Sequence, residues 1–292
     1  MSAPILSVVV AVQHAQQNLP ELLRVLDIIN HQEVEFLFCY TDADPEIAAK
    51  LAGESSIRLM HSAPGSLIPH LWRDGIQAAQ GDYVAITTAH CIPDGDWLRN
   101  LEQVQWEELA GVGGIIENHA DSTALDWAVY LLRYVSFAPP QTVRRVEEIA
   151  ADNAVYRRAL IQQQPDLLQQ GFWEPSFHAR FRVAGFALAL DPRLRVIHRN
   201  RYTARQFFAQ RYAHGRAFGL ARANALPLFK RMLLVVLSPL LPLVFLRKIV
   251  VAARGNPHTR GHLPRALPWL LFFLLGWGLG EARAYIESMV RR

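Results

Sequence analysis

The first 118 residues alternate apolar runs of strand length with segments of helical periodicity. The apolar or β-branched runs lie at 5–12, 34–40, 57–61, 83–87 and 111–118. Helical patterns separate them, at 18–30, 44–53, 67–80 and 97–108. Strands that alternate with helices in this way indicate an α/β fold with a doubly wound, mostly parallel sheet.

The pattern changes in the remainder of the chain. A helical pattern at 125–137 and two short strand runs at 186–190 and 194–198 precede a basic, aromatic helix at 202–221. Two uncharged runs of 15 residues then follow, at 232–246 and 266–280. Each gives about 22 Å of helix, short of the roughly 30 Å hydrocarbon core of a bilayer. We therefore expect a domain at 1–225 and a membrane-associated helical hairpin at 226–292.

Charge sharpens the interpretation of this C-terminal region. The formal net charge is +4, and five cations lie between the two apolar runs: Arg247, Lys248, Arg254, Arg260 and Arg265. A hairpin that crosses the membrane twice would export these charges, against the positive-inside bias. We expect a monotopic or re-entrant pair with cytoplasmic connections, with a spanning hairpin and a buried soluble hairpin as alternatives.

The same charges and the absence of nucleic-acid motifs favour a membrane surface over a nucleic acid as partner. Cys39 and Cys91 are the only cysteines and are expected to be reduced and structural. The first apolar run has no basic segment before it, so it reads as a strand and not as a signal peptide. These features predict a catalytic part on the cytoplasmic face of a membrane.

The stretch 81–98 carries the clearest chemical signal. The strand run at 83–87 is followed directly by Thr88 and His90. A turn of Pro, Asp and Gly then leads into a helical pattern that begins at Trp97. Ligands of open α/β sheets bind outside the carboxyl ends of the strands. Thr88 and His90 are therefore candidate ligand-binding residues.

This stretch resembles the "Gly-Asp-Tyr, apolar, Asp-x-Asp, x-Pro-x-x-x-Trp-Leu" signature of family 2 glycosyltransferases, and the resemblance extends over about 4–222. That family comprises inverting enzymes of the GT-A fold that use nucleotide sugars. Its Asp-x-Asp carboxylates hold a divalent metal, Mn or Mg, against the donor diphosphate. Thr88, Ala89 and His90 stand in those places here, so metal dependence is left open.

The resemblance implies further donor-side residues. Arg73 lies in a segment similar to "Ala-Arg-Asn-x-Gly", where its guanidinium would pair with the diphosphate or brace a neighbouring carboxylate. His198 falls where the family often has a histidine. His90 and His198 would form a metal site together, or hydrogen-bond without a metal. Arg211 lies in a sequence loosely similar to "Gln-x-x-Arg-Trp" and would reach donor phosphates or lipid headgroups.

Three residues are candidates for binding the nucleotide base. His14 follows the first strand run, and Tyr40 and Asp42 follow the second, where the family places a base-binding carboxylate. Alternatively, His14 is a solvated histidine in a turn, and Tyr40 packs locally at the end of its strand.

The acceptor side is implied by two later segments. Asn153 lies in a sequence similar to "Gly-x-Asn-x-x-x-Arg-Arg" and would hydrogen-bond sugar or backbone. Glu174 aligns with the second acid of "Glu-Asp-x-x-Leu-x-x-Arg", and Trp173 replaces the first acid and is assigned to the acceptor. Glu174 is the candidate general base for the acceptor hydroxyl, and its alternative role is to begin a helix.

These expectations combine into one function and one alternative. The first is a membrane-associated inverting glycosyltransferase that moves a sugar from a nucleotide-sugar donor to a lipid-linked or membrane-proximal acceptor. The alternative is a degenerate relative that binds nucleotide sugar or lipid as a scaffold. A nucleotidyltransferase is less favoured because no glycine-rich basic loop follows the first strand.

Overall fold

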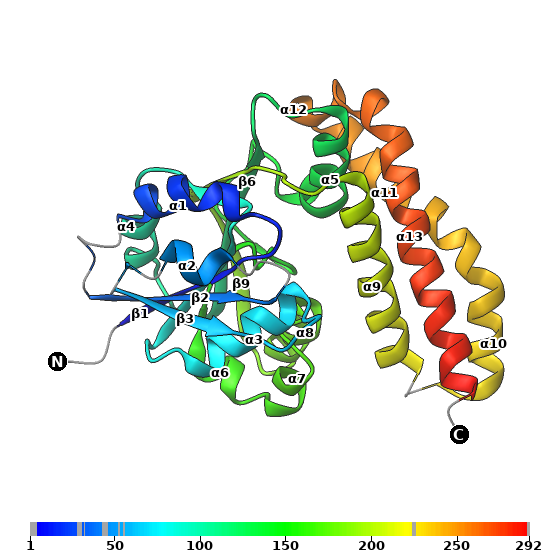
Figure 1. Ribbon diagram of the computed structural model, residues 1–292, viewed down its shortest axis with the longest axis horizontal. Helices are drawn as coiled ribbons and strands as arrows, with labels where there is room; N and C mark the ends of the chain where they lie inside the picture. Colours follow the sequence, from blue (N-terminus) through cyan, green and yellow to red (C-terminus); the bar gives the residue numbers. More distant parts are fainter. Residues whose placement is uncertain are drawn as a thin grey trace. The chain divides into compact units, whose positions relative to one another are not determined.

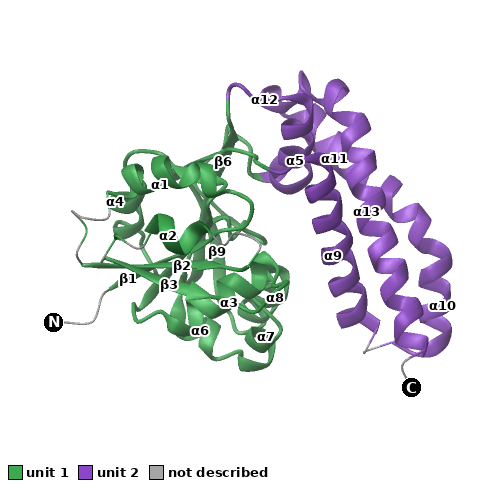
Figure 2. Cartoon of the chain, in the orientation of Figure 1, with its two compact units in different colours: residues 1–119, 137–201 green, residues 120–136, 202–292 purple. Residues whose placement is uncertain are grey.

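The computed structural model describes residues 5–27, 31, 33–42, 46–51, 53, 54, 56–223 and 226–290. The chain forms two compact units (Figure 2). Unit 1 comprises Met1–His119 and Phe137–Arg201, and unit 2 comprises Ala120–Ser136 and Tyr202–Arg292. The division therefore differs from the boundary expected at 225, because the helix after Tyr202 packs with the C-terminal helices. The parts of the expected helices at 28–30 and 43–45 lie outside the described residues.

Unit 1 is an α/β unit built on one sheet (Figure 1). Its strands are β1 Leu6–Ala11, β2 Val34–Tyr40, β3 Ile57–His61, β4 Tyr83–Thr88, β5 Cys91–Pro93, β6 Leu109–Asn118, β7 Arg144–Val146, β8 Asn153–Arg157 and β9 Ala187–His198. Its helices are η1 Gln16–Asn18, α1 Leu19–Leu26, α2 Glu46–Leu51, α3 Ile68–Ala78, α4 Trp97–Glu102, α6 Arg158–Gln162, α7 Pro165–Gln169 and α8 Glu174–Val183.

The sheet order is β3-β2-β1-β4-β8-β6-β9-β5, with β7 paired to β9. The first four of these strands run parallel, as expected for a doubly wound half. Beyond them β8 lies antiparallel to both β4 and β6, while β6 and β9 are parallel. The α/β fold class is confirmed, and the second half of the sheet is mixed. The two strand runs expected at 186–190 and 194–198 are one strand, β9, whose pairing with β6 contains register shifts.

The core of unit 1 follows directly from the apolar runs. Every residue of β1 is buried, as in a strand covered on both faces. Val9 and Leu37 of the parallel strands share a buried cluster with Trp72 and Ile76 of α3. This packing fixes the strand ends that carry the candidate site.

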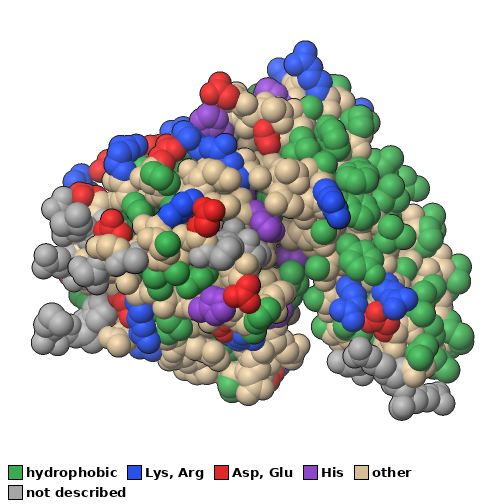
Figure 3. All heavy atoms as spheres, in the orientation of Figure 1, with side chains coloured by type: hydrophobic (Ala, Val, Ile, Leu, Met, Phe, Trp, Pro, Cys, Tyr) green, Lys and Arg blue, Asp and Glu red, His purple; other side chains and the backbone are tan. Residues whose placement is uncertain are grey.

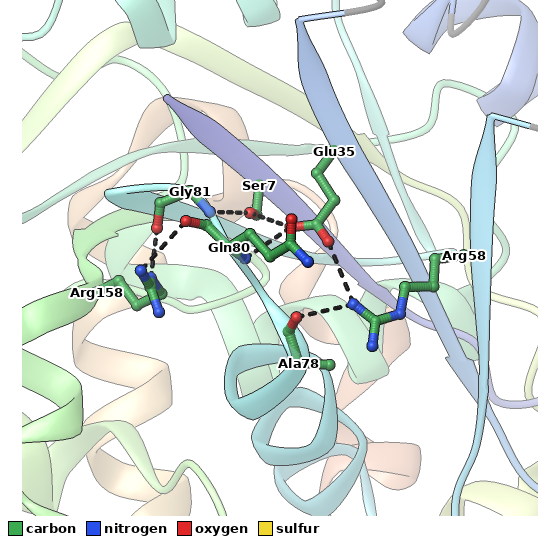
Figure 4. A network of polar contacts seen from close by, with 7 residues as sticks. All are labelled: Ser7, Glu35, Arg58, Ala78, Gln80, Gly81 and Arg158. Atoms are coloured by element: carbon green, nitrogen blue, oxygen red, sulfur yellow. Dashed lines mark hydrogen bonds and ion pairs between the residues drawn. The ribbon is translucent and has the colours of Figure 1, made fainter. Parts of the chain in front are cut away.

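A polar network holds the entry to β4 against its neighbours (Figure 4). Ser7 Oγ donates to Glu35 Oε2 at 2.6 Å and accepts from the Gly81 N–H at 2.9 Å. The Gln80 N–H also donates to Glu35 Oε2, at 2.8 Å, and Arg58 pairs with Glu35 at 3.5 Å. The turn before β4 is therefore tied to β1, β2 and β3, which sets where β4 ends.

Unit 2 is helical. It consists of α5 Ala124–Tyr134, most of the turn η3 Val135–Phe137, α9 Ala204–Ala223, α10 Leu228–Leu237, η4 Ser238–Leu240, α11 Leu241–Gly255, α12 Pro257–Arg260 and α13 Leu263–Val290. Helices α9 and α13 touch through their backbones. A Cβ added at Gly215 would lie 2.2 Å from the Trp277 carbonyl oxygen, and one at Gly280 would lie 2.1 Å from that of Tyr212. Small residues permit such close helix packing.

The faces of unit 2 differ in polarity. Towards α9, α13 presents Glu287 and Glu281, which pair with Arg216 at 2.6 Å and Arg222 at 3.7 Å. Apolar side chains of α10, α11 and α13 are exposed, and Figure 3 shows them gathered over these helices. The stretches Leu228–Gly255 and Leu263–Val290 are long and apolar enough to cross a membrane, by length and composition alone.

Candidate active site

A carboxylate lies at the carboxyl end of β4, although β4 itself contributes none. Because β8 runs antiparallel beside β4 with Asn153 opposite Thr87, the residue before β8 falls next to Thr88. The Thr88 hydroxyl donates to Asp152 Oδ1 at 3.2 Å, and the Thr87 hydroxyl donates to the Asp152 carbonyl oxygen at 2.8 Å. The pairing of β8 with β4 thus places an acid, Asp152, at the edge of the sheet where the resembled family has its Asp-x-Asp.

Glu174 lies close to the same segment. It is the first residue of α8, as its alternative role implied, and its Oε1 accepts from the Ala151 N–H at 3.4 Å. Glu174 and Asp152 both act electrostatically on Tyr156, whose pKa is raised first by burial and then by Glu174, Glu148 and Asp152. Two carboxylates therefore flank residue 151 beside the end of β4.

Trp173 is held by local contacts next to Glu174. Its indole N–H donates to the Gln170 carbonyl oxygen at 3.0 Å, and its ring meets His70 edge to face at 6.3 Å between centroids. The side chain is half-buried. The acceptor role of Trp173 stays a prediction.

His90 and His198 approach each other from β4–β5 and β9. Both are fully buried, and their ring centroids are 6.2 Å apart. His90 Nδ1 lies 3.2 Å from the Arg199 carbonyl oxygen, and Nε2 lies 3.0 Å from that of Gln13. A neutral imidazole can donate from only one nitrogen. The ring therefore lies between two carbonyl oxygens, and its N–H can donate to either of them.

The metal-binding role expected for His90 stays a prediction. In this structure both ring nitrogens face backbone carbonyl oxygens. Within the ranges that the structure describes, no three His, Cys, Asp or Glu side chains are grouped as a metal site. His198 Nδ1 instead lies 3.4 Å from Asn118 Oδ1. Use of a divalent cation stays a prediction, and the base chemistry proposed below does not require one.

The acceptor role expected for Asn153 stays a prediction. Its side chain is fully buried, and Oδ1 accepts from the Trp97 indole N–H at 2.8 Å. Its Nδ2 donates to the carbonyl oxygens of Ile115 at 2.9 Å and Leu194 at 3.0 Å. A Cβ at Gly114 would lie 2.4 Å from this Nδ2, so only glycine leaves room for it. Of the two partners predicted for Asn153, the backbone is the one observed.

Arg73 likewise takes the second of its two predicted roles. Its guanidinium donates to Asp74 Oδ1 at 2.7 Å and to the Gln169 carbonyl oxygen at 3.3 Å. Asp74 also accepts from the Ser62 hydroxyl at 2.5 Å. Arg73 braces a neighbouring carboxylate and joins α3 to α7; its contact with a diphosphate stays a prediction.

The candidate base-binding residues lie at the carboxyl ends of β1 and β2. His14 follows β1 with a positive φ of 55°. Tyr40 meets His61 edge to face at 5.2 Å between centroids, and His61 pairs with Asp42 at 2.7 Å. Tyr40, His61 and Asp42 thus form one partly exposed cluster, consistent with the local packing predicted for Tyr40. Base binding by His14, Tyr40 and Asp42 stays a prediction.

Arg211 belongs to unit 2. Its guanidinium lies 4.9 Å from the Phe207 ring centroid and 5.9 Å from that of Trp277, and donates to Gln210 Oε1 at 3.0 Å. The side chain is buried among these groups. Its binding to phosphates stays a prediction.

A hydrogen-bonded chain of Tyr156, His178 and Glu148, in which Tyr156 and His178 are buried and Glu148 is exposed, was not anticipated from the sequence. His178, four residues along α8, contacts the Tyr156 hydroxyl at 3.0 Å through Nε2 and Glu148 through Nδ1. Burial alone would raise the Glu148 pKa, but the His178 hydrogen bond and the charges of His178 and Arg182 outweigh it, and the pKa is lowered. No local spacing in the sequence signals this chain, because Tyr156, His178 and Glu148 come from separate segments.

The hollow of about 730 Å³ beneath the 93–97 turn contains none of the predicted site residues. Its lining includes the acids Glu21, Asp27, Asp94 and Asp96 and the cations Arg24 and Arg99. The acids outnumber the arginines, which does not favour binding of a diphosphate. The candidate site is therefore the edge formed by Thr88, Asp152 and Glu174.

The sheet order, the acids at the end of β4 and the helices after the strands define an α/β transferase of the GT-A type. The family described as Glycosyl transferase family 2 matches residues 7–164, and the chain belongs to that family. The resemblance stated from the sequence motifs is confirmed.

Two of the known proteins that are similar to this chain illustrate its relationships. A dolichyl N-acetyl-alpha-D-glucosaminyl phosphate 3-beta-D-2,3-diacetamido-2,3-dideoxy-beta-D-glucuronosyltransferase of Methanococcus voltae is 26% identical over 225 residues, 70% of each chain. The mannosyltransferase PcManGT of Pyrobaculum calidifontis, solved with GDP-Man and Mn2+, superimposes with a TM-score of 0.52 at 17% identity, covering 96% of this chain and 88% of that one. The latter supports the fold.

Proposed function

We propose that this chain is a membrane-associated, inverting glycosyltransferase that moves a sugar from a nucleotide-sugar donor to a lipid-linked or membrane-proximal acceptor. The observation that carries the proposal is the juxtaposition of Glu174 and Asp152 at the end of β4, in a chain of this family. The dolichyl phosphate named for the archaeal relative supports a lipid-linked acceptor.

Glu174 is the general base in this proposal. Its carboxylate takes the proton from an acceptor hydroxyl while that oxygen forms a bond to the anomeric carbon. The bond from this carbon to the donor phosphate breaks on the opposite face, and its electron pair leaves with the nucleoside diphosphate. The configuration is inverted because attack and departure lie on opposite faces.

Positive charge for the diphosphate comes from the protein in this proposal. His90 lies at the end of the strand where ligands of such sheets bind, with both ring nitrogens facing carbonyl oxygens. Arg73 contributes through its position on α3 beside Asp74. If Mn or Mg binds here as in the family, most of its ligands would be oxygens of the donor phosphates, because few side chains that could bind a metal are grouped at this edge.

Unit 2 supplies the membrane association. Helix α13 packs along α9, and α9 carries Arg205, Arg211, Arg216 and Arg222. If α13 crossed the bilayer, α9 would accompany it, and each arginine near the centre would cost about 2.5–3.5 kcal/mol. The arrangement supports a monotopic or re-entrant unit on the cytoplasmic face, with α10, α11 and the outer face of α13 against lipid.

Nucleotide release tests the enzyme function. Detergent-purified protein is incubated with a panel of nucleotide sugars and membrane lipid extract, with and without Mn or Mg, and released nucleotide is measured. Glu174→Gln should lower release by about 10²–10⁴-fold, the usual contribution of a general base. Asp166→Asn is the control, because Asp166 is an exposed acid paired with Arg180 at 2.9 Å in the same unit.

Two outcomes would contradict the proposal in different ways. Undiminished release by Glu174→Gln would remove Glu174 from catalysis. Donor binding without release under every condition would instead support the scaffold alternative, which the absence of the Asp-x-Asp favours.

A further inference from the structure

A groove in unit 2 combines apolar walls with cationic side chains. It lies between α11, α12 and α13 and has a volume of about 490 Å³. Leu243, Leu246, Val250, Leu263 and Leu267 form its apolar lining, and Arg247, Arg254 and Arg260 are its charged residues. A volume of this size is within the usual range for pockets that bind small ligands.

The guanidinium groups of the groove arginines have no partner among the described residues. The side chains of Arg247, Arg254 and Arg260 make no hydrogen bond or ion pair there, although the Arg260 backbone N–H donates to the Asn256 carbonyl oxygen at 3.0 Å. The arginines of α9 and α13 behave differently, since Arg216 and Arg283 both pair with Glu287. The sequence from 226 to 280 contains no Asp or Glu at all. The groove therefore presents uncompensated positive charge to its surroundings.

The surroundings of the groove are apolar. Leu243 is 58% exposed and Leu267 39% exposed, and both continue into the exposed apolar surface of α10, α11 and α13. Arginine recognises phosphate with two parallel hydrogen bonds, and its guanidinium is more weakly hydrated than an ammonium group. An anionic group that carries an alkyl chain matches both parts of the groove. A free anion would leave the apolar walls exposed to water.

We propose that this groove binds an anionic membrane lipid, with its phosphate held by Arg247, Arg254 and Arg260 and its first alkyl segment against Leu243 and Leu267. The proposal rests on the membrane association proposed above and adds a defined lipid site to it. It does not depend on sugar transfer.

Vesicle flotation of the full-length protein tests the site. Wild-type protein is compared with a groove variant, Arg247→Gln/Arg254→Gln/Arg260→Gln, on phosphatidylcholine vesicles with and without phosphatidylglycerol. The matched control is Lys230→Gln/Lys248→Gln/Arg265→Gln, which removes three charges of the same segment outside the groove. We expect phosphatidylglycerol to strengthen wild-type binding. The groove variant should lose about fivefold per arginine, on the order of 100-fold in all, and the control clearly less.

A second measurement separates a lipid phosphate from a free one. Binding of soluble dihexanoyl phosphatidic acid is compared with binding of inorganic phosphate and dihexanoyl phosphatidylcholine. The short lipid phosphate should bind best, and Leu267→Gln should weaken it without changing the binding of inorganic phosphate. Equal binding of inorganic phosphate would refute the lipid site.

The outcomes distinguish this inference from the proposed function. Equal losses in the groove variant and its control would show diffuse attraction and overturn the groove, while membrane association stood. Failure to bind any vesicle would overturn both the groove and the membrane association. Neither result bears on nucleotide release by Glu174.

Discussion

Replacing Asn153 by alanine tests the structural role that the fold gives it. Asn153 joins three elements, because its amide contacts Trp97 of α4, Ile115 of β6 and Leu194 of β9. In Asn153→Ala, the Trp97 indole N–H and the carbonyl oxygens of Ile115 and Leu194 stay buried but lose their hydrogen bonds to this side chain. The resembled family places an acceptor contact at this position, so the two roles predict different losses.

The expected loss of stability is large. A buried polar group left without its partner costs about 1–3 kcal/mol, and three such groups that share one site give about 3–5 kcal/mol in total. Domains are stable by only about 5–15 kcal/mol, so this loss is a substantial fraction. Asn100, a half-buried asparagine of α4, donates one hydrogen bond to the Arg193 carbonyl oxygen at 3.0 Å. Asn100→Ala should cost about 1 kcal/mol or less.

Urea unfolding followed by tryptophan fluorescence measures both variants. We expect the Asn153→Ala midpoint to fall well below that of wild type and the Asn100→Ala midpoint to stay close to it. Nucleotide release, measured at a temperature where the variant is folded, should fall no more than its folded fraction. An unchanged midpoint combined with a raised KM for the acceptor would refute the structural role and restore the acceptor contact.

Two further predictions concern the Glu148–His178 pair and the helix contact of unit 2. The pKa of Glu148 is lowered in the folded state, so the stability that Glu148 contributes is complete above the ordinary carboxyl pKa and is lost as the pH falls through the folded pKa. Glu148→Gln should therefore flatten the loss of stability below about pH 5, measured by urea unfolding across pH. An unchanged pH profile would contradict this. Gly280→Val should force α13 away from α9 and lower thermal stability by about 1–3 kcal/mol. Gly261→Val is the control, because the space around a Cβ at Gly261 is open. Equal effects of the two substitutions would refute the close contact.

The first half of the fold was predictable from local pattern alone. Strands β2 and β3 have the bounds expected at 34–40 and 57–61, because buried parallel strands are short apolar runs between turns. Helix α4 ends at Glu102, earlier than the expected 108. Trp106 stacks on Tyr83 with 4.3 Å between ring centroids, and its carbonyl accepts from Arg157. These long-range contacts override a pattern that favoured helix.

Sequence motifs predicted residues of the candidate site, but they did not predict which residues these contact in the fold. Motif order identified Glu174, which the structure places beside residue 151. It could not identify Asp152 as the neighbour of Thr88, because that contact depends on the pairing of β8 with β4, strands separated by more than sixty residues. Asn153 shows the converse. A motif residue that resembles a ligand contact is used here to hold strands together.

The departure from the family motif is a redistribution of charge and not only a loss of carboxylates. Two acids on one strand would attract a divalent cation, which in turn neutralises a diphosphate. Here one acid, Asp152, comes from the residue before the neighbouring strand β8 and accepts from Thr88, while the His90 ring lies between two carbonyl oxygens. An imidazole thus stands at the place of a metal-binding carboxylate. His90→Ala should therefore lower nucleotide release, and undiminished release would remove this edge from the chemistry.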